Sequence, residues 1–400
     1  MPSGDADSDD VSPGRVGVRE RAGALLRSTV LPPLEEGERR RLVSIDALRG
    51  LALAGMLLVN NHALAGEPPL WLSHADWEGL RFADVVFPAF LFVAGVSLAF
   101  SFGRRVTQHP VRVWAHFIFR VAALVAIGVV LNHFTYGDPL RVPGVLQRIG
   151  LSLLIAAPFV RLKPWWILAV GLVLLAGHSA ALLWVTPPTV AEGALRAFEA
   201  LPRYVDTTVF GAEHLHPSGF DPEGLLGLAS SAGQVLLGAA VGRTLHAYPR
   251  NARALVWLAI GGFAALVAGW WLDPVALPVV KKLWTASFVL VTSGAATMIL
   301  VAFYAIADWL RGERLIAWLV PPGRNALAAY VGAAALTLWL RSLEVTGPAG
   351  EATNAIGALS VGMVTAFGPV AGALGYSTAH VLLWYAVTSA LDRSRVYIKL

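Results

Sequence analysis

The sequence predicts an all-α polytopic membrane protein with about ten transmembrane helices and one further interfacial or re-entrant helix. Of its 400 residues, 56% are hydrophobic and 14% are charged, and the mean hydropathy is +0.62. Apolar runs of roughly 20 residues recur along the chain, each long enough to cross a hydrocarbon core of about 30 Å. This composition excludes an ordinary soluble domain, and it assigns the net charge of +5 to membrane topology rather than to nucleic-acid binding.

The predicted spans are joined by short connections, except for a long loop at 188–223 that we expect to cover the outer opening. Small residues four positions apart, such as Gly238 and Gly242, allow helices to approach closely. Residues 351–370 are apolar but interrupted by Gly and Pro, which favours an interfacial or re-entrant helix over a span. The ten spans are predicted at about 46–65, 82–103, 112–134, 144–161, 164–187, 224–246, 253–272, 283–309, 323–343 and 371–391.

The distribution of basic residues predicts the orientation of these spans. Of the 31 Lys and Arg residues, 21 fall on the side of the two termini, 7 on the other side and 3 within spans. By the positive-inside rule both termini are cytoplasmic, and the loop that contains His74 lies outside. Residues 1–40 begin with an acidic, turn-forming stretch and carry no secretory signal, so we expect a largely disordered, basic cytoplasmic tail before a single transmembrane domain at 41–400.

The chain contains no cysteine, which excludes disulfides, thiolate metal sites and a cysteine nucleophile. His214 and His216 have metal-ligand spacing, but two ligands without a third do not make a site, so we expect no metal. Walker loops, GxGxxG turns, GxSxG elbows and HExxH helices are all missing from the sequence.

The stretch 72–97 places a polar turn directly before an apolar helix, and it contains His74, Asp76, Trp77 and Asp84. A carboxylate at the edge of the hydrocarbon is costly unless it faces protein, water or a cation, so Asp84 is a functional candidate. The alternative is that His74 is only a solvated or packing residue of an interfacial loop.

Arg148 is a second intramembrane charge that needs a partner. The predicted topology places Arg148 and Asp84 in the same outer third of the membrane. We therefore predict that these two residues are coupled as a buried ion pair.

The first span carries polar residues at both ends. At about 100° per residue, Arg49 and Asn60 share one helical face at a separation of about 16 Å. Asp46 precedes Arg49 by three residues, so the two side chains either neutralise one another or bind a ligand. Asn61 follows Asn60 at the outer end.

Between these ends, Gly50, Ala54 and Gly55 present little side-chain volume on the first span. We expect this surface to admit a slim ligand, such as an extended acyl carrier arm.

Asp221 and Glu223, in the long outer loop, have two interpretations. Asp221, Pro222 and Glu223 form the start signal of a helix, with an N-cap, a proline at the first position and an acid facing the helix dipole. In the second interpretation both carboxylates contact a substrate at the outer opening.

Seven blocks of the sequence, in this order, resemble the family of heparan-alpha-glucosaminide N-acetyltransferase and its bacterial relatives. The resemblance covers nearly the whole chain from Arg41, although the large luminal domain and additional first span of the animal enzyme are missing. Asp76 departs from the small polar residue expected at that position of the animal protein, so acceptor recognition there differs. The blocks are RLVSIDALRGLALAGMLLVNN, LSHADWEGLRFADVVFPAFLFVAGVS, VPGVLQRIG, FDPEGLLG, KKLWTASFVLVTSG, PPGRNALAAYV and RVYIKL.

The resemblance implies a transmembrane acetyltransferase that takes acetyl from cytoplasmic acetyl-CoA and delivers it to an amino sugar or related glycan on the other side. The family's active-site histidine falls on His74, and its asparagine after the first span falls on Asn60. A neutral histidine serves as base or nucleophile, an Asn60 or Asn61 amide donates to the thioester oxyanion, and Asp84 orients the imidazole or pairs with an arginine. Candidates to contact CoA are Asp46, Arg49, Asn61, Arg148, Arg324 and Asn325, and candidates to contact the acceptor are Asp76, Trp77, Asp221 and Glu223.

A secondary transporter of a sugar or other small solute is the alternative function, although the two halves show no inverted repeat with matched helix interruptions. A membrane assembly partner without enzymatic activity is a third class, but it has no need for the His74 block. We expect a multi-pass protein of the bacterial inner membrane, in contact with the lipid bilayer, with an envelope amino sugar as acceptor. A homodimer, the acyl-chain preference and the choice between an acetyl-histidine and direct transfer stay open.

Overall fold

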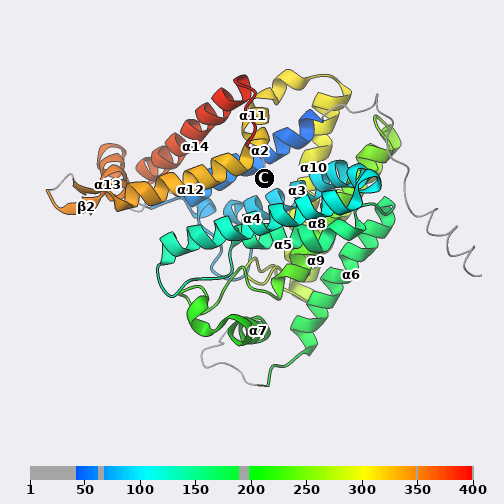
Figure 1. Cartoon of the computed structure of the whole chain (residues 1–400), viewed down its shortest axis with the longest axis horizontal. Helices are drawn as coiled ribbons and strands as arrows, with labels where there is room; N and C mark the ends of the chain where they lie inside the picture. Colours follow the sequence, from blue (N-terminus) through cyan, green and yellow to red (C-terminus); the bar gives the residue numbers. More distant parts are fainter. Residues whose placement is uncertain (1–41, 62–66, 189–197, 348–349, 399–400) are drawn as a thin grey trace, which may run out of the picture.

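The computed structural model describes residues 42–61, 67–188, 198–347 and 350–398, and this part of the chain is almost entirely helical (Figure 1). Its one sheet pairs β1 (Glu344–Thr346) with β2 (Ala352–Asn354) antiparallel, with Val345 opposite Thr353. The predicted cytoplasmic tail at 1–40 lies outside the described residues.

Four helices form the centre of the molecule. Within their apolar spans, 67% of α2 and 61% of α3 are buried, against 11% of α9 at the periphery. The helix α8 lies between α3 and α6 and is buried along most of its length. The central helices are α2 (Val43–Asn60), α3 (Phe82–Gln108), α8 (Gly227–Ala247) and α10 (Ala286–Phe303), the last continuing as a π-helical turn (Tyr304–Trp309).

Glycines set the close packing of α3 against α8. A Cβ atom on Gly95 would lie 2.0 Å from the carbonyl oxygen of Val235, and one on Gly238 would lie 2.1 Å from that of Phe92. Gly242 faces Val96 in the same way, with 2.7 Å to its carbonyl oxygen. These contacts confirm the prediction that Gly238 and Gly242 let two helices approach closely.

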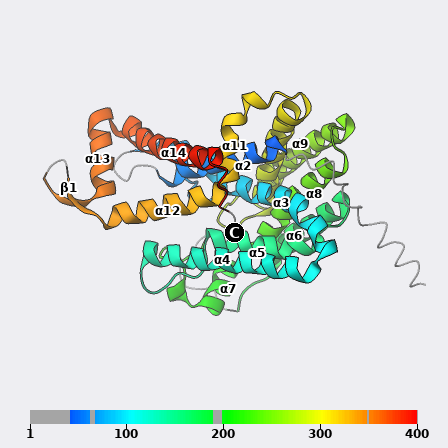
Figure 2. The same cartoon turned by 45° about the horizontal axis from the view of Figure 1, so that its top comes forward.

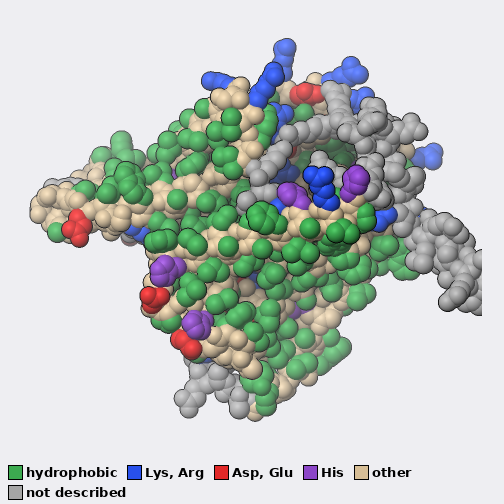
Figure 3. All heavy atoms as spheres, viewed as in Figure 1, with side chains coloured by type: hydrophobic (Ala, Val, Ile, Leu, Met, Phe, Trp, Pro, Cys, Tyr) green, Lys and Arg blue, Asp and Glu red, His purple; other side chains and the backbone are tan. Residues whose placement is uncertain are grey.

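The remaining long helices surround this centre and expose apolar side chains outward. Figure 3 shows hydrophobic side chains over most of the visible face. Such a surface is what a bilayer covers, because lipid tails are as apolar as the side chains. The surrounding helices are α4 (Pro110–Tyr136), α5 (Val145–Ala156), α6 (Pro164–Trp184), α9 (Ala252–Val275), α12 (Ala326–Ser342) and α14 (Pro369–Arg393).

Seven helices of the described residues are long and apolar enough to cross a membrane, which confirms the all-α polytopic fold class. The predicted re-entrant segment is α13 (Ala355–Phe367), and its 13 residues cover only about 20 Å, too little for a span. Figures 1 and 2 both show α12, α13 and α14 together at one side of the molecule. Two shorter helices are α7 (Ala200–Phe210), between α6 and α8, and α11 (Val320–Arg324), before α12.

The interpretation of Asp221 as a helix N-cap is wrong. The helix α8 starts at Gly227, with Leu226 at the N-cap position, and residues 221–226 form turns. Asp221 instead accepts hydrogen bonds from its own loop, including the backbone N–H of Glu223 at 3.0 Å. The start signal therefore describes a turn that precedes the helix.

Connections that the predicted topology assigns to one side do contact one another. At one end the N–H of Gly79 donates to Val279, and that of Val142 donates to His214. At the other end the N–H of Arg250 donates to the Tyr304 hydroxyl. Figure 3 shows most of the visible Lys and Arg side chains toward the end where α2 begins and α14 ends.

Candidate active site

The loop that carries His74 lies between a short 3₁₀ turn (Leu70–Leu72) and α3. An Arg81 guanidinium N–H donates to the carbonyl oxygen of His74 at 2.8 Å, and the N–H of Gly79 donates to Val279 at 2.9 Å. These bonds hold the backbone of the histidine and of the turn that follows it, so its imidazole is presented from an ordered loop.

Asp84 organises this loop from the first turn of α3, where its side chain is buried. Its Oδ2 accepts the backbone N–H groups of Ala75 at 3.0 Å and of Arg81 at 3.1 Å. Its Oδ1 lies 2.9 Å from His74 Nδ1. In the tautomer whose Nδ1–H donates to Asp84, Nε2 carries a lone pair that is available as base or nucleophile.

Lys281 completes the His74 cluster, the name we give to His74, Asp84 and Lys281. Its Nζ lies 2.9 Å from Nδ1 and 3.3 Å from Nε2 of His74, and 3.5 Å from Asp84 Oδ1. Burial lowers the pKa of Lys281, although nearby Asp84 opposes the shift. The sequence reasoning did not include Lys281, and the available signal was a pair of lysines on the side predicted to be poor in basic residues.

The predicted ion pair between Asp84 and Arg148 is wrong. Arg148 is buried at 2% exposure, with its guanidinium 4.8 Å from the centre of the Trp284 ring. One of its N–H groups donates to Gly224, 3.3 Å away. The helix α5 directs this side chain toward the segment that precedes α8, so Asp84 pairs with His74 and Lys281 instead. Arg148 also lines none of the cavities described below.

A cavity of about 100 Å³ adjoins the imidazole, which we call the His74 cavity. Its polar lining comes from His74, Asn60, Glu223, Lys281 and Tyr330. The structure thus brings together three of the predicted site residues from three separate segments. Tyr330 was missed by the sequence reasoning, and the available signal was a hydroxyl group within the largely apolar helix α12.

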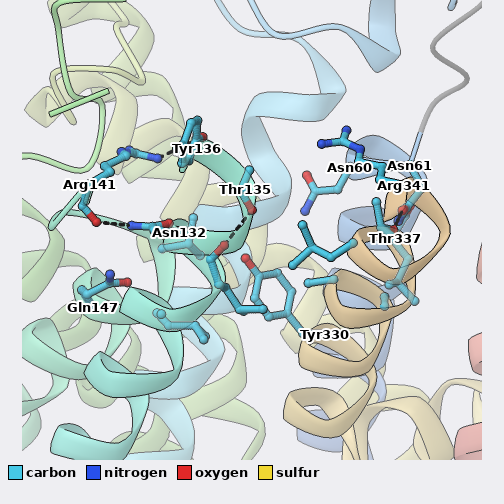
Figure 4. Close-up of a pocket in the computed structure, with 18 residues that line it drawn as sticks. Asn60, Asn61, Asn132, Thr135, Tyr136, Arg141, Gln147, Tyr330, Thr337 and Arg341 are labelled. Carbon is cyan, nitrogen blue, oxygen red and sulfur yellow. Dashed lines mark hydrogen bonds between the residues drawn. The ribbon is translucent and has the colours of Figure 1, made fainter. Parts of the chain in front are cut away.

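A larger cavity of about 350 Å³ continues from the first, and we call it the polar cavity (Figure 4). Asn60, Val145 and Tyr330 line both cavities, so the two spaces meet at these residues. Figure 4 shows the polar cavity between α4 and α5 on one side and α2 and α12 on the other, with polar groups from both sides. Cavities of this size and mixed lining are typical of small-molecule sites.

The two asparagines that end α2 differ in what they offer. The Asn61 amide donates to the Leu57 carbonyl at 2.8 Å and accepts from the Thr337 hydroxyl at 3.1 Å, so it fastens α2 to α12. The side chain of Asn60 has no hydrogen-bond partner among the described residues and lines both cavities. Asn60 is therefore the amide that a ligand can reach.

The residues predicted to contact the acceptor have different surroundings in the structure. Trp77 packs edge-on against Phe220, with 5.4 Å between ring centres, so this side chain anchors its loop to a neighbouring loop. Asp221 is buried and accepts two hydrogen bonds from Arg141, at 2.9 and 2.7 Å. Asp76 is exposed beside the His74 cluster, and its carbonyl oxygen accepts from Lys282 at 3.0 Å.

At the other end of α2, four side chains form the Arg49 cluster (Asp46, Arg49, Arg324 and Asp392). Arg49 lies 3.2 Å from Asp46, and Arg324 lies 3.6 Å from Asp46 and 3.0 Å from Asp392. Arg49 also donates to the Gly323 carbonyl at 3.1 Å and to the Ser97 hydroxyl. Each arginine thus faces carboxylates within the protein.

Asn325, the remaining predicted CoA contact at that end, is completely buried, and its side-chain oxygen accepts from Ile398 at 3.2 Å. The expected slim surface along the first span is also absent from the described structure. A Cβ atom on Gly50 would lie 1.9 Å from the Leu319 carbonyl oxygen, and one on Gly55 would lie 3.1 Å from a Val86 methyl. Neighbouring helices occupy this face, so an acyl carrier arm does not fit there.

The fold and the site define a polytopic helical membrane protein in which an oriented histidine lines a cavity at the ends of the spans. Residues 41–269 match the family model for "Heparan-alpha-glucosaminide N-acetyltransferase, catalytic", and the chain belongs to this family. Human heparan-alpha-glucosaminide N-acetyltransferase is 29% identical over 375 residues, covering 77% of this chain and 54% of the human protein. The mouse protein of the same name is 28% identical over 364 residues, which cover 75% of this chain and 54% of the mouse protein. The chain spans about half the length of these curated relatives.

Proposed function

We propose that this protein transfers acetyl from acetyl-CoA to the amine of an amino sugar, with His74 as the reacting histidine. The observation that carries the proposal is the His74 Nδ1 to Asp84 Oδ1 contact of 2.9 Å at the border of the His74 cavity. Membership of the acetyltransferase family and the names of its human and mouse members support this choice of reaction.

In direct transfer, Nε2 of His74 accepts a proton from the acceptor amine as its nitrogen attacks the thioester carbonyl carbon. The new N–C bond forms, the C–S bond breaks, and the proton passes to the sulfur of CoA, which leaves as the thiol. The Asn60 amide and the Lys281 ammonium stabilise the negative charge on the carbonyl oxygen during attack. Asp84 holds the imidazole in the required tautomer.

In the covalent alternative, Nε2 attacks the thioester carbonyl carbon, the C–S bond breaks and CoA leaves as the thiolate, so that His74 carries the acetyl group. The amine nitrogen then attacks the acetyl carbon, the bond to Nε2 breaks, and the proton that the amine loses balances the thiolate. Both routes use the same tautomer of His74. Incubation with radiolabelled acetyl-CoA without an acceptor distinguishes them, because only the covalent route leaves an acid-sensitive label on His74.

For the CoA phosphates we propose the exposed edges of Arg49 and Arg324, which are 21% and 27% exposed, with the carrier arm following a path other than the closed Gly50 face of α2. Each already faces a carboxylate, so a phosphate there competes with Asp46 or Asp392. We propose that the donor binds on the cytoplasmic side and that the His74 cluster lies outside, in a bacterial inner membrane with both termini cytoplasmic. Single cysteines at Ser218 and Ser394, both exposed, test the orientation, since an impermeant thiol reagent should label only the first in intact cells.

The proposal is tested with purified protein, acetyl-CoA and glucosamine. His74→Ala should lower the turnover about 100- to 10,000-fold, the range expected for loss of a general base. His133→Ala is the matched control, because His133 lies at the outer end of α4 with a similar exposure, 48% against 47% for His74. The control should retain the wild-type rate.

Wild-type turnover in His74→Ala would remove the histidine from the reaction. A wild-type protein that moves glucosamine across a vesicle membrane without consuming acetyl-CoA would instead favour the transporter. Both assays use the same purified protein, so the two functions are compared directly.

A further inference from the structure

An apolar groove runs between α4 and α12 on the lipid-facing surface of the protein, and we call it the lateral groove. Its volume is about 620 Å³. Val130 and Phe134 on α4 and Trp339 on α12 line it and are 53%, 68% and 58% exposed. In a membrane these side chains face the lipid tails rather than water.

The lateral groove is as long as one leaflet is deep. Its lining follows α12 from Val331 to Ser342, about 16 Å at 1.5 Å per residue, against about 15 Å for half of the hydrocarbon core. Both α4 and α12 end at the side of the His74 cluster, so the groove lies in that leaflet. Its dimensions suit one extended hydrocarbon chain.

The lateral groove leads into the candidate active site. Leu131 and Leu338 line both the groove and the polar cavity, and Asn60 and Tyr330 line both the polar cavity and the His74 cavity. A continuous series of cavities therefore joins the lipid-facing surface to the imidazole. A second apolar groove of about 520 Å³, between α6 and α9, shares no lining residue with either of these cavities.

One basic side chain lines the polar cavity just beyond the lateral groove. Arg341 lies one turn after Leu338, is exposed, and faces the same cavity as Asn60 (Figure 4). It has no carboxylate partner among the described residues, unlike Arg141, which contacts Asp221 and Glu223. An unpaired arginine at this depth suits a phosphate group that a lipid carries at the membrane surface.

From these observations we infer that the acceptor is an amphiphile, an amino sugar joined through a phosphate to a hydrocarbon chain. The inference rests on the proposed acetyl transfer. The chain occupies the lateral groove, the phosphate contacts Arg341, and the sugar fills the polar cavity with its amine toward His74. The acceptor then enters from the membrane and not from the aqueous phase.

The test compares three acceptors with the protein in lipid nanodiscs: glucosamine, glucosamine 1-phosphate and the dodecyl phosphodiester of glucosamine 1-phosphate. The wild type should show a kcat/KM about tenfold or more higher for the dodecyl compound than for glucosamine 1-phosphate, because the groove raises its effective concentration. Arg341→Gln should remove the advantage of glucosamine 1-phosphate over glucosamine.

Ala335→Trp fills the lateral groove from α12, and it should reduce the ratio between the dodecyl compound and glucosamine 1-phosphate to about one. Ala264→Trp places the same bulk in the second groove, on α9, and should leave the ratio unchanged. Because each ratio is measured within one preparation, a reduced folded fraction cancels.

An unchanged ratio in Ala335→Trp, or an equal loss in Ala264→Trp, would overturn the inference. A higher KM for acetyl-CoA with every acceptor in Ala335→Trp would also overturn it, since the groove would then belong to the donor. If glucosamine is acetylated and neither the phosphate nor the hydrocarbon chain raises kcat/KM, the proposed function stands and only the inference of an amphiphilic acceptor is contradicted. If none of the three amines is acetylated, both the proposed acetyl transfer and the amphiphilic acceptor are contradicted.

Discussion

The His74 cluster and the Arg49 cluster gather charged side chains at opposite ends of the helical bundle, yet they are built differently. The His74 cluster lines a cavity, and its imidazole is 47% exposed beside the Asn60 amide, which no side chain of the described residues contacts by a hydrogen bond. In the Arg49 cluster each arginine faces an aspartate, and backbone fills the space around it. Charges at the ends of spans therefore do not by themselves create a cavity for a ligand, because the available space depends on how the neighbouring helices pack.

The largest expected effect is the loss of turnover in Asp84→Asn, which tests whether the His74 cluster acts in the reaction. An amide donates to His74 Nδ1 where the carboxylate accepted from it, so the proton moves to Nε2 and the base is lost. We expect turnover of acetyl-CoA with glucosamine to fall about 1,000-fold. The matched control is Asp138→Asn, because Asp138 lies 3.6 Å from His133 with 84% exposure, and it should keep the wild-type rate. A rate for Asp84→Asn within twofold of wild type would show that the imidazole needs no partner.

A second prediction concerns the packing that closes the Arg49 cluster. A Cβ atom on Gly323 would lie 1.8 Å from the Asp46 carbonyl oxygen, whereas one on Gly261 in α9 would meet nothing within 4 Å. Gly323→Ala should therefore destabilise the protein by about 3 kcal/mol through backbone displacement, and Gly261→Ala should be neutral or slightly stabilising. Thermal unfolding in one detergent measures both. Equal melting temperatures would mean that α2 and α11 are less closely packed.

The smallest effect is expected from Asp206, a buried acid of α7 whose Oδ2 has no hydrogen-bond partner among the described residues. Burial raises the pKa of Asp206 to about 6, from an ordinary value near 4. Because the pKa of Asp206 is higher in the folded protein than in the unfolded chain, protonation of this group favours the folded state. This contribution to the free energy of unfolding is fully present below about pH 4 and is lost as the pH rises through about 6.

Asp206→Asn keeps this group neutral at every pH, and its oxygen retains the hydrogen bond from the Leu225 N–H, 2.7 Å long in the wild type. The variant should match the wild type at pH 4 and exceed it above pH 6.5 by on the order of 3 kcal/mol at most. Melting curves across this pH range measure the difference. A constant difference at all pH values would contradict a titrating Asp206.

The sequence by itself determined the elements and the local part of the site. Hydropathy and length predict the spans because a membrane helix satisfies its own backbone, whatever its neighbours are. The contact between His74 and Asp84 is also local, since only ten positions and one turn separate them. The shortness of α13 follows from the Gly and Pro residues that interrupt its segment.

Only the tertiary structure decided which side chains meet across the bundle. Lys281 lies 207 positions after His74, and Tyr330 reaches the same cavity from α12. Arg148 turns toward Trp284 instead of Asp84, and Gly50 packs against the backbone of Leu319 instead of a ligand. Each outcome depends on the rotation and spacing of helices far apart in sequence. No periodicity within a single segment encodes that arrangement.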